Sequence, residues 1–313
     1  MKFPKFIIIP ISAMLLSGCG GLPSGESTTA GGGSTSTDPG VIIPKDDYYN
    51  TDEYNLNGTR GAKLQYEIHR LCLDTHRVLV YYKDVNSYLA PAGGRTYSTD
   101  QVSADVAKNQ LFYTGKQVNL STSGATREHV WPCAKSSGMW VHSNYTDIKY
   151  YVDGPTYAGG GSDLYHVRPC TSSVNTIRGD SRYKEFSEAE KAAATIASDG
   201  GPYTLYADKS EFANYSEPPD EFKGDIVRIL MYVYVHYCKM GTYNWEGLCG
   251  NLRLQDVMGY SDEKEMQKIM VKWNNLDPVS ETEKLRNQTV QAIQGNRNPF
   301  VDYPHLMAKC FNL

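Results

Sequence analysis

The stretch that decides the fold reads R-E-H-V-W-P, from Arg127 to Pro132, and continues after a Gly-, Ser- and Tyr-rich loop as D-L-Y-H-V-R-P-C-T-S-S-V-N-T-I-R-G-D, from Asp163 to Asp180. The first segment has strand-forming residues and stops at a proline. The second places Leu164, His166 and Arg168 at alternate positions, which is typical of a strand. Another proline ends this strand, and the serines that follow are preferred N-caps of a helix. The predicted local order is strand, long loop, strand, helix.

Three polar side chains in these segments are candidates for a common site. Glu128 and His129 are adjacent, and neighbouring side chains of a strand point to opposite faces. Both reach one site only where the strand ends or bulges. Asn175 falls in the first turn of the predicted helix, where Ser172 and Ser173 are candidate N-caps. We therefore expect Glu128, His129 and Asn175 to lie together.

This order, with this histidine and this asparagine, resembles the His-Me finger (ββα-metal) nucleases, and within them the endonuclease I family of secreted and periplasmic bacterial nucleases. The resemblance covers roughly residues 64–304, and further blocks follow in the family's order: G-D-I-V-R-I-L-M-Y at 224–232, K-W-N-N-L-D-P-V-S-E-T-E-K-L-R-N at 272–287 and Q-G-N-R-N-P-F-V-D-Y-P at 294–304. It implies an α+β fold, with a His-Me finger core embedded in a mainly helical single domain.

The resemblance also implies a chemistry. Phosphodiester hydrolysis needs a base for water, positive charge beside the phosphorus oxygens, and stabilisation of the leaving 3′ oxygen. By resemblance, His129 is the general base, and Glu128 and Asn175 bind the cation. Mg²⁺ is expected because it prefers oxygen ligands, with Mn²⁺ or Ca²⁺ as alternatives.

One departure from the family concerns the arginine that contacts the scissile phosphate. In the family this arginine lies between the two strands, but residues 133–162 contain no arginine here. Arg127, Arg168 and Arg178 are the candidates, because the guanidinium forks onto phosphate oxygens. Arg178 is favoured as a catalytic residue because it follows Asn175 on the same element. A fold-stabilising role is an equally good interpretation of Arg127 and Arg168.

The N-terminal segment predicts export. Residues 1–18 combine basic residues with a short apolar run, which is typical of a cleavable signal peptide. The L-S-G-C sequence ending at Cys19 resembles a bacterial lipobox and implies a lipidated Cys19; the alternative is a plain signal peptide with a chance cysteine. Residues 19–46 are rich in Gly, Ser and Thr and predict a flexible tether. Residues 47–313 are long enough for one domain.

The cysteines fit an exported chain. If Cys19 is lipidated, six remain, and an even number in an exported protein predicts disulfides. Three pairs are candidates, with free buried thiols as the alternative: Cys133–Cys170 and Cys238–Cys249 from their positions, and Cys72–Cys310 by elimination. No Cys-x-x-Cys spacing is present, which makes a cysteine-based zinc site less favoured.

Helices are predicted to dominate the domain. Apolar residues recur at helical spacing from Leu64 to Val78. Lys184–Asp199 is rich in Ala and Glu, and 224–236 is apolar nearly all round, as in a buried helix. Ser280 begins an S-E-T-E capping box and Gly295 is suited to the end of a helix, so a helix is expected at Glu281–Gln294. Strands are expected only around the site.

The sequence-based hypothesis is a membrane-anchored, metal-dependent, non-specific endonuclease on the cell surface or in the periplasm. It is expected to act on DNA, and in addition on RNA, and to leave 5′-phosphate and 3′-hydroxyl ends. A monomer without a protein partner is expected. The formal net charge of −4 differs from the basic excess common in nucleic-acid binders, so binding should rely on the cation and a few basic contacts. Two alternatives stay open: a surface binding lipoprotein with a decayed nuclease fold, and a phosphodiesterase for small nucleotides.

Overall fold

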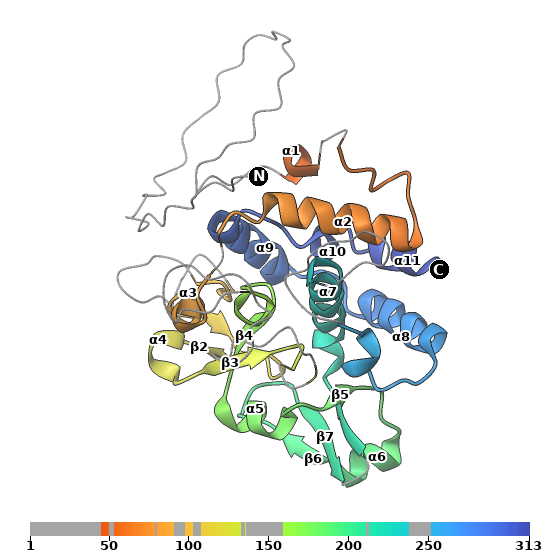
Figure 1. Cartoon of the computed structure of the whole chain (residues 1–313). Coiled ribbons are helices and arrows are strands. Elements are labelled where there is room, and N and C mark those ends of the chain that lie inside the picture. The colour runs from red at the N-terminus through yellow and green to blue at the C-terminus, as the bar shows by residue number, and fades with distance from the viewer. Residues whose placement is uncertain are drawn as a thin grey trace.

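A computed structural model describes residues 45–49, 53–78, 80–90, 98–102, 108–132, 135, 159–210, 213–237 and 252–313 (Figure 1). The described elements combine helices with small sheets, so the predicted α+β class is confirmed. The predicted signal peptide, Cys19 and nearly all of the predicted tether lie outside the described residues. Within them, no helix has the length and apolar character needed to cross a membrane.

A long central helix organises the helical part of the domain. α7 (Asp220–Tyr237) is buried along nearly its whole length, as its apolar sequence predicts. It packs against α2 (Gly61–Thr75) and α8 (Glu263–Leu276), and α2 buries the face that carries its regularly spaced apolar residues. The other helical elements are short apart from α9: α1 (Lys45–Tyr49), η1 (Tyr82–Asp84), α3 (Val85–Leu89), α4 (Leu120–Ser123), η3 (Gly160–Ser162), α5 (Ser172–Arg178), α6 (Glu188–Ala193), η4 (Leu254–Asp256), α9 (Glu281–Gln294), α10 (Pro299–Asp302) and α11 (Leu306–Phe311).

Helix α9 begins and ends where its sequence predicts. The Ser280 hydroxyl accepts a hydrogen bond from the Glu283 N–H at 3.1 Å, and the Glu283 carboxylate accepts one from the Ser280 N–H at 3.2 Å. The chain leaves the helix through Gly295, at a φ of 95° that glycine adopts without a side-chain clash. The predicted capping box is confirmed.

The described strands form three sheets. β1 (Asn109–Gln110) pairs with β2 (Gln117–Val118), and β3 (Thr126–His129) pairs antiparallel with β4 (Val167–Cys170). The third sheet consists, in spatial order, of β5 (Arg182–Tyr183), β8 (Ala213–Glu217), β7 (Leu205–Ser210) and β6 (Thr195–Ala197). β5 and β8 are parallel, and the other two pairs are antiparallel. Besides the expected strand pair, the described residues thus form a four-stranded sheet that the sequence did not indicate.

The helix expected at Lys184–Asp199 is also mostly absent. Only Glu188–Ala193 is helical, and it begins at a capping box between Ser187 and Glu190. Thr195–Ala197 is the edge strand β6 instead. The β-branched residues of this segment pair with β7, so tertiary pairing overrides the helical composition.

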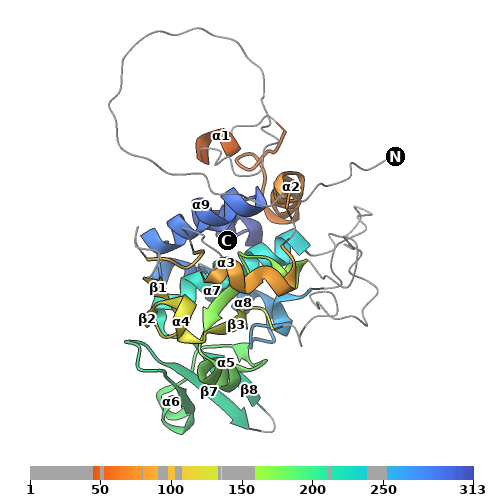
Figure 2. The same cartoon turned by 90° about the vertical axis from the view of Figure 1, so that its left-hand side faces the viewer.

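The β3–β4 hairpin and α5 lie between the helical part and the four-stranded sheet (Figures 1 and 2). Helix α5 packs against β3 on one side and against β6 and β7 on the other. Among the described residues, strand β3, strand β4 and helix α5 follow one another in the predicted order. The hairpin is thus supported by packed elements on both sides.

The described cysteines are free thiols. Cys72, Cys170 and Cys310 are all buried, and the Cys72–Cys310 disulfide expected by elimination does not form. The Cys72 thiol instead donates to the Arg297 carbonyl oxygen at 3.8 Å. Burial raises the pKa of the Cys72 and Cys310 thiols and keeps them protonated. The other predicted partners lie outside the described residues: Cys133, Cys238 and Cys249.

Candidate active site

A cleft of about 450 Å³ lies between the end of β3 and helix α5. Glu128, His129 and Asn175 all line it, so the structure brings together the three residues expected to form a site. His129 is the last residue of β3, which lets adjacent side chains reach the same cleft. Ser172 and Arg178, which were also named from the sequence, line the cleft as well. The rest of the wall consists of residues to which no role was assigned from the sequence: Thr126, Pro132, Thr176, Gly179 and Asp180.

Glu128 is a buried carboxylate held through one of its two oxygens. The residue is only 1% exposed, and its Oε1 accepts a hydrogen bond from the Tyr113 hydroxyl at 2.7 Å. Arg178 Nη1 lies 3.4 Å from the same oxygen. Burial raises the pKa of Glu128, whereas the Arg178 charge and the Tyr113 hydrogen bond lower it. Oε2 receives no hydrogen bond from the described residues.

Tyr113 is a site residue whose role the sequence did not indicate. It is fully buried and has a φ of 70°, in the left-handed region that bulky residues rarely adopt. Its hydroxyl contacts both Glu128 and the Tyr183 hydroxyl, the latter at 2.6 Å. Because these contacts join residues far apart in the sequence, no local pattern indicates them.

His129 is oriented by a backbone carbonyl. Its Nε2 lies 2.8 Å from the Gly161 oxygen in η3, and a carbonyl can only accept, so Nε2 carries the proton. Nδ1 is then the basic nitrogen. Burial lowers the pKa of His129 to about 4; the charges of Arg127 and Arg178 act in the same direction, against the Gly161 carbonyl. The imidazole is therefore neutral near pH 7 and able to accept a proton.

Asn175 is oriented by β3. Its Nδ2 donates to the Arg127 carbonyl oxygen at 2.9 Å, which leaves the amide oxygen as the group that accepts contacts. The helix that carries it begins at Ser172, but its N-cap is Thr171 and no side chain caps it, so the predicted serine caps were wrong.

Arg178 lines the cleft, but protein acceptors surround its guanidinium. The residue is 1% exposed and lies over the Tyr183 ring at 4.7 Å. Its donors reach four further acceptors: His129 O at 3.3 Å, Gly179 O at 2.9 Å, Val130 O at 2.6 Å and the Tyr183 hydroxyl at 2.6 Å. These contacts fix the end of β3 beside Glu128.

The other two candidate arginines have different surroundings. Arg168 is 2% exposed and forms a 2.6 Å ion pair with Asp100, outside the cleft wall. Arg127 is partly exposed and stacks over the Tyr82 ring at 4.0 Å. Its one side-chain hydrogen bond among the described residues, from Nη1 to Tyr82 O, is 2.8 Å long. Tyr82 also stacks on His129, with ring centroids 5.7 Å apart.

The donor set of the cleft fits a hard divalent cation. Glu128 and Asn175 each use one end of the side chain within the protein and keep an oxygen that no described residue occupies. Oxygen ligands with open positions for water suit Mg²⁺. The neutral His129 imidazole beside them supplies a base.

Comparisons with known proteins agree with this geometry. The family model described as Endonuclease I matches residues 61–305. The chain is 32% identical over 291 residues to the "Extracellular ribonuclease" of Bacillus amyloliquefaciens, covering 88% of this chain and 84% of that protein. It is 29% identical to the "Extracellular ribonuclease" of Bacillus subtilis, covering 84% and 80%, and 25% identical to the "Endonuclease-1" of Buchnera aphidicola, covering 61% and 68%. The chain therefore belongs to the endonuclease I family and is a nuclease of the hydrolase class.

Proposed function

We propose that the chain is an exported, metal-dependent endonuclease that hydrolyses DNA and RNA with little sequence preference, leaving 5′-phosphate and 3′-hydroxyl ends. The observation that carries this proposal is the cleft in which a neutral histidine adjoins two oxygen donors, Glu128 and Asn175. The order of the paired strands β3 and β4 and of helix α5 supports a His-Me finger core.

The residues divide the chemistry among them. His129 Nδ1 takes the proton of the attacking water, while Nε2–H stays on Gly161 and keeps the ring in place. Glu128 and Asn175 would hold the divalent cation, which would supply positive charge to offset the negative charge on the phosphate and on the leaving 3′ oxygen. Arg178 acts as a positioning residue for Glu128 and for the end of β3.

Arg127 is the arginine we assign to the substrate backbone. It is partly exposed beside His129 and Tyr82, and only one of its donors is used within the described residues. A guanidinium with unused donors binds phosphate in a bidentate manner. Phosphate contacts carry no sequence information, which agrees with low specificity.

The substrate range follows from two kinds of support. Two relatives are named ribonucleases and one is named an endonuclease, which supports RNA as a substrate beside DNA. An open cleft, unlike a closed pocket, admits a continuous strand.

The extracellular relatives support export, and we further propose that lipidated Cys19 and the 19–46 tether hold the domain at a membrane surface.

The test uses a soluble form beginning near Asp47, with supercoiled plasmid and structured RNA as substrates. With Mg²⁺, plasmid should be nicked and then degraded, and product mapping should find 5′-phosphates. Excess chelator should stop the reaction. Products with cyclic phosphate ends would contradict attack by water. No cleavage by folded protein across several divalent cations would favour a binding lipoprotein.

The anchor is tested separately in cells. The full chain should fractionate with membranes, and Cys19→Ala should release it into the soluble fraction. Equal membrane association of both forms would contradict lipidation of Cys19.

A further inference from the structure

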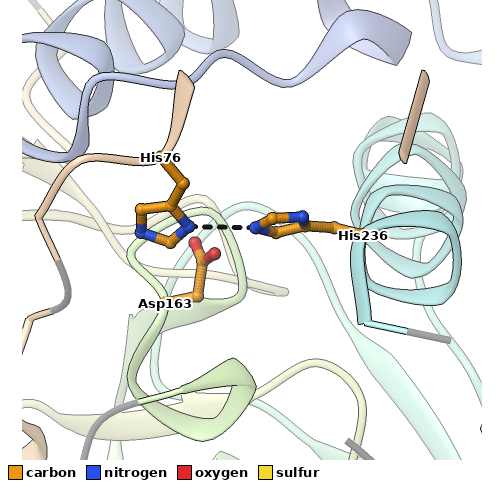
Figure 3. Close-up of side chains that lie close together, drawn as sticks. All are labelled: His76, Asp163 and His236. Atoms are coloured by element: carbon orange, nitrogen blue, oxygen red, sulfur yellow. Dashed lines mark hydrogen bonds between the residues drawn. The ribbon is translucent and has the colours of Figure 1, made fainter. Parts of the chain in front are cut away.

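A second cluster of metal-ligating side chains lies in the interior, away from the cleft wall. It consists of His76, directly after α2, Asp163, directly after η3, and His236 in α7. One ligand atom from each lies within 4.8 Å of the other two. Figure 3 shows the two imidazoles and the carboxylate meeting at one point from three separate segments. Asp163 and His236 are fully buried.

The two imidazoles present nitrogen atoms to each other. His76 Nδ1 and His236 Nε2 are 2.9 Å apart. The other His76 nitrogen, Nε2, lies 3.1 Å from the Val78 carbonyl oxygen and therefore carries the proton. The lone pair of His76 Nδ1 faces the cluster. A histidine held in this way by a backbone carbonyl has the tautomer and orientation that metal ligands have in proteins.

The Asp163 carboxylate is held rigidly but lacks a positive partner. No lysine or arginine of the described residues lies within 4.0 Å of it. A buried carboxylate costs free energy unless a positive charge compensates it. Four neutral donors fix its position: Tyr165 N at 2.7 Å, Gln294 Nε2 at 3.2 Å, Tyr232 OH at 2.8 Å and Tyr237 OH at 2.6 Å.

We propose that His76, Asp163 and His236 bind a second divalent cation of the zinc class, separate from the cation of Glu128 and Asn175. Two imidazole nitrogens and one carboxylate oxygen suit Zn²⁺ and its neighbours, whereas Mg²⁺ prefers oxygen alone. Three protein ligands leave the fourth position of a tetrahedral ion to water. The ion supplies the positive charge that buried Asp163 lacks.

The position of this site predicts a supporting role. Asp163 follows η3, whose Gly161 carbonyl orients His129. The Ser162 hydroxyl of η3 donates to Val80 O, close after His76 in the chain. An ion at the cluster therefore joins the end of α2, helix α7 and the segment that positions the catalytic histidine. Its removal should lower stability first and activity as a consequence.

The proposal is tested by metal binding to the full chain, which does not depend on nuclease activity. After chelator treatment and dialysis, Co²⁺ is titrated in excess Mg²⁺, which keeps the oxygen site of Glu128 and Asn175 filled. One equivalent should bind, with the visible absorption of nitrogen-ligated cobalt, and Zn²⁺ should displace it. His76→Gln and His236→Gln should each weaken binding by at least about 100-fold.

Two matched variants separate this site from others. His69→Gln changes a buried histidine within α2 that is not part of the cluster and should keep the cobalt equivalent. Glu128→Gln alters the cleft and should also keep it. No tight equivalent in the wild-type chain would overturn the proposal, as would full binding by folded His76→Gln and His236→Gln. The pair would then be a direct imidazole–imidazole hydrogen bond.

Where the histidine variants do not fold, the wild-type chain decides the question by itself. X-ray absorption at the zinc edge of the one-equivalent complex should show two imidazole ligands. A spectrum with oxygen ligands only would contradict the proposal.

Discussion

The bonds that Glu128 and Asn175 already make would orient both side chains for the proposed cation. Tyr113 and Arg178 engage Glu128 through Oε1, and the Arg127 carbonyl engages Asn175 through Nδ2. Each side chain therefore keeps a fixed orientation with one oxygen available. Preorganised ligands lose little entropy on binding, which would favour the proposed site because only two protein groups would hold the ion.

The charge of Glu128 is testable with an isosteric change. Glu128→Gln keeps the acceptor for the Tyr113 hydroxyl but removes the negative charge that attracts the cation. We expect cleavage to fall by at least about 100-fold, with part of the loss recovered at high Mg²⁺. The measurement is the plasmid-nicking rate as a function of Mg²⁺ concentration.

Glu217→Gln is the matched control. Glu217 is a buried glutamate paired with Lys223 at 2.7 Å, and it does not line the cleft. This variant should lose stability but keep the wild-type dependence on Mg²⁺. Equal Mg²⁺ dependence of Glu128→Gln and the wild-type chain would remove Glu128 from the metal site.

Local sequence indicated part of this site and left out the rest for a physical reason. Glu128, His129 and Asn175 sit at a strand end and a helix start, which one short stretch defines. Tyr113 and Gly161 reach the same site through contacts that depend on the whole fold. The sequence also did not predict that the Arg178 side chain is buried and therefore bonded to protein acceptors.

Strand β4 is joined to the helical part by a buried charge cluster. Arg168 pairs with Asp100 at 2.6 Å and with Asp225 of α7 at 3.6 Å, and Arg286 of α9 lies 3.3 Å from Asp100. These pairs connect the hairpin that carries the site to two helices. Buried pairs of this kind are costly to break, because the remaining charge has no solvent.

Arg168→Met tests whether Arg168 supports the fold or binds substrate. Removing the charge leaves Asp100 with Arg286 alone, and we expect a loss of about 3–5 kcal/mol in the free energy of unfolding. Activity per folded molecule should stay near wild type. Urea unfolding and cleavage are measured on the same samples. A stable variant with a strongly raised KM would instead place Arg168 on the substrate.

His166 ties the hairpin to η3 and makes this region sensitive to acid. Its Nδ1 donates to Gly160 O at 2.8 Å, and its Nε2 accepts from Trp131 N at 2.9 Å. Burial, with the His129 charge, lowers the pKa of His166 to about 3. As pH falls below the unfolded value near 6.5, the unfolded chain takes up a proton that the folded chain cannot.

Stability should therefore fall with pH in a way that His166→Gln reduces. Between pH 7 and pH 5 this histidine accounts for a loss of about 2 kcal/mol in the free energy of unfolding, and the variant should lack that part. His305→Gln, which changes an exposed histidine, should leave the pH dependence close to wild type. Parallel curves for His166→Gln and the wild-type chain would contradict the assignment.

Elements with self-contained signals were predictable, and elements that depend on pairing were not. Helix α9 carries its own cap at Ser280 and its own end at Gly295, and α7 is apolar throughout. The Lys184–Asp199 segment has helical composition, but its Thr195–Ala197 part pairs with β7 as a strand. A partner distant in the sequence decides such cases.

For the whole molecule, the cluster of His76, Asp163 and His236 shows the limit of sequence reasoning. Two of its residues directly follow α2 and η3 and the third lies in α7, and no spacing motif links them. The resemblance to a family pointed to the residues of the candidate cleft, because they follow one continuous pattern. A site assembled by the packing of distant elements becomes visible only in three dimensions.

The formal net charge of −4 gives the chain no overall electrostatic attraction for a nucleic acid. Binding should rest on the cation and a few local contacts, so affinity should decrease with added salt by a shallow slope. Replacing Arg127 with Ala should raise KM several-fold and reduce that slope, with little change in kcat. A fall in kcat alone would place Arg127 in the chemistry and not in binding.

The most direct test of the central claim is the rate of plasmid cleavage by His129→Ala beside the wild-type domain, at saturating Mg²⁺. If His129 is the base, the rate should fall by about 10²–10⁴-fold while unfolding and Mg²⁺ affinity stay unchanged. Added imidazole should restore part of the rate, because it replaces the missing base. A His129→Ala variant that cleaves at the wild-type rate would show that the cleft identified here is not the catalytic site.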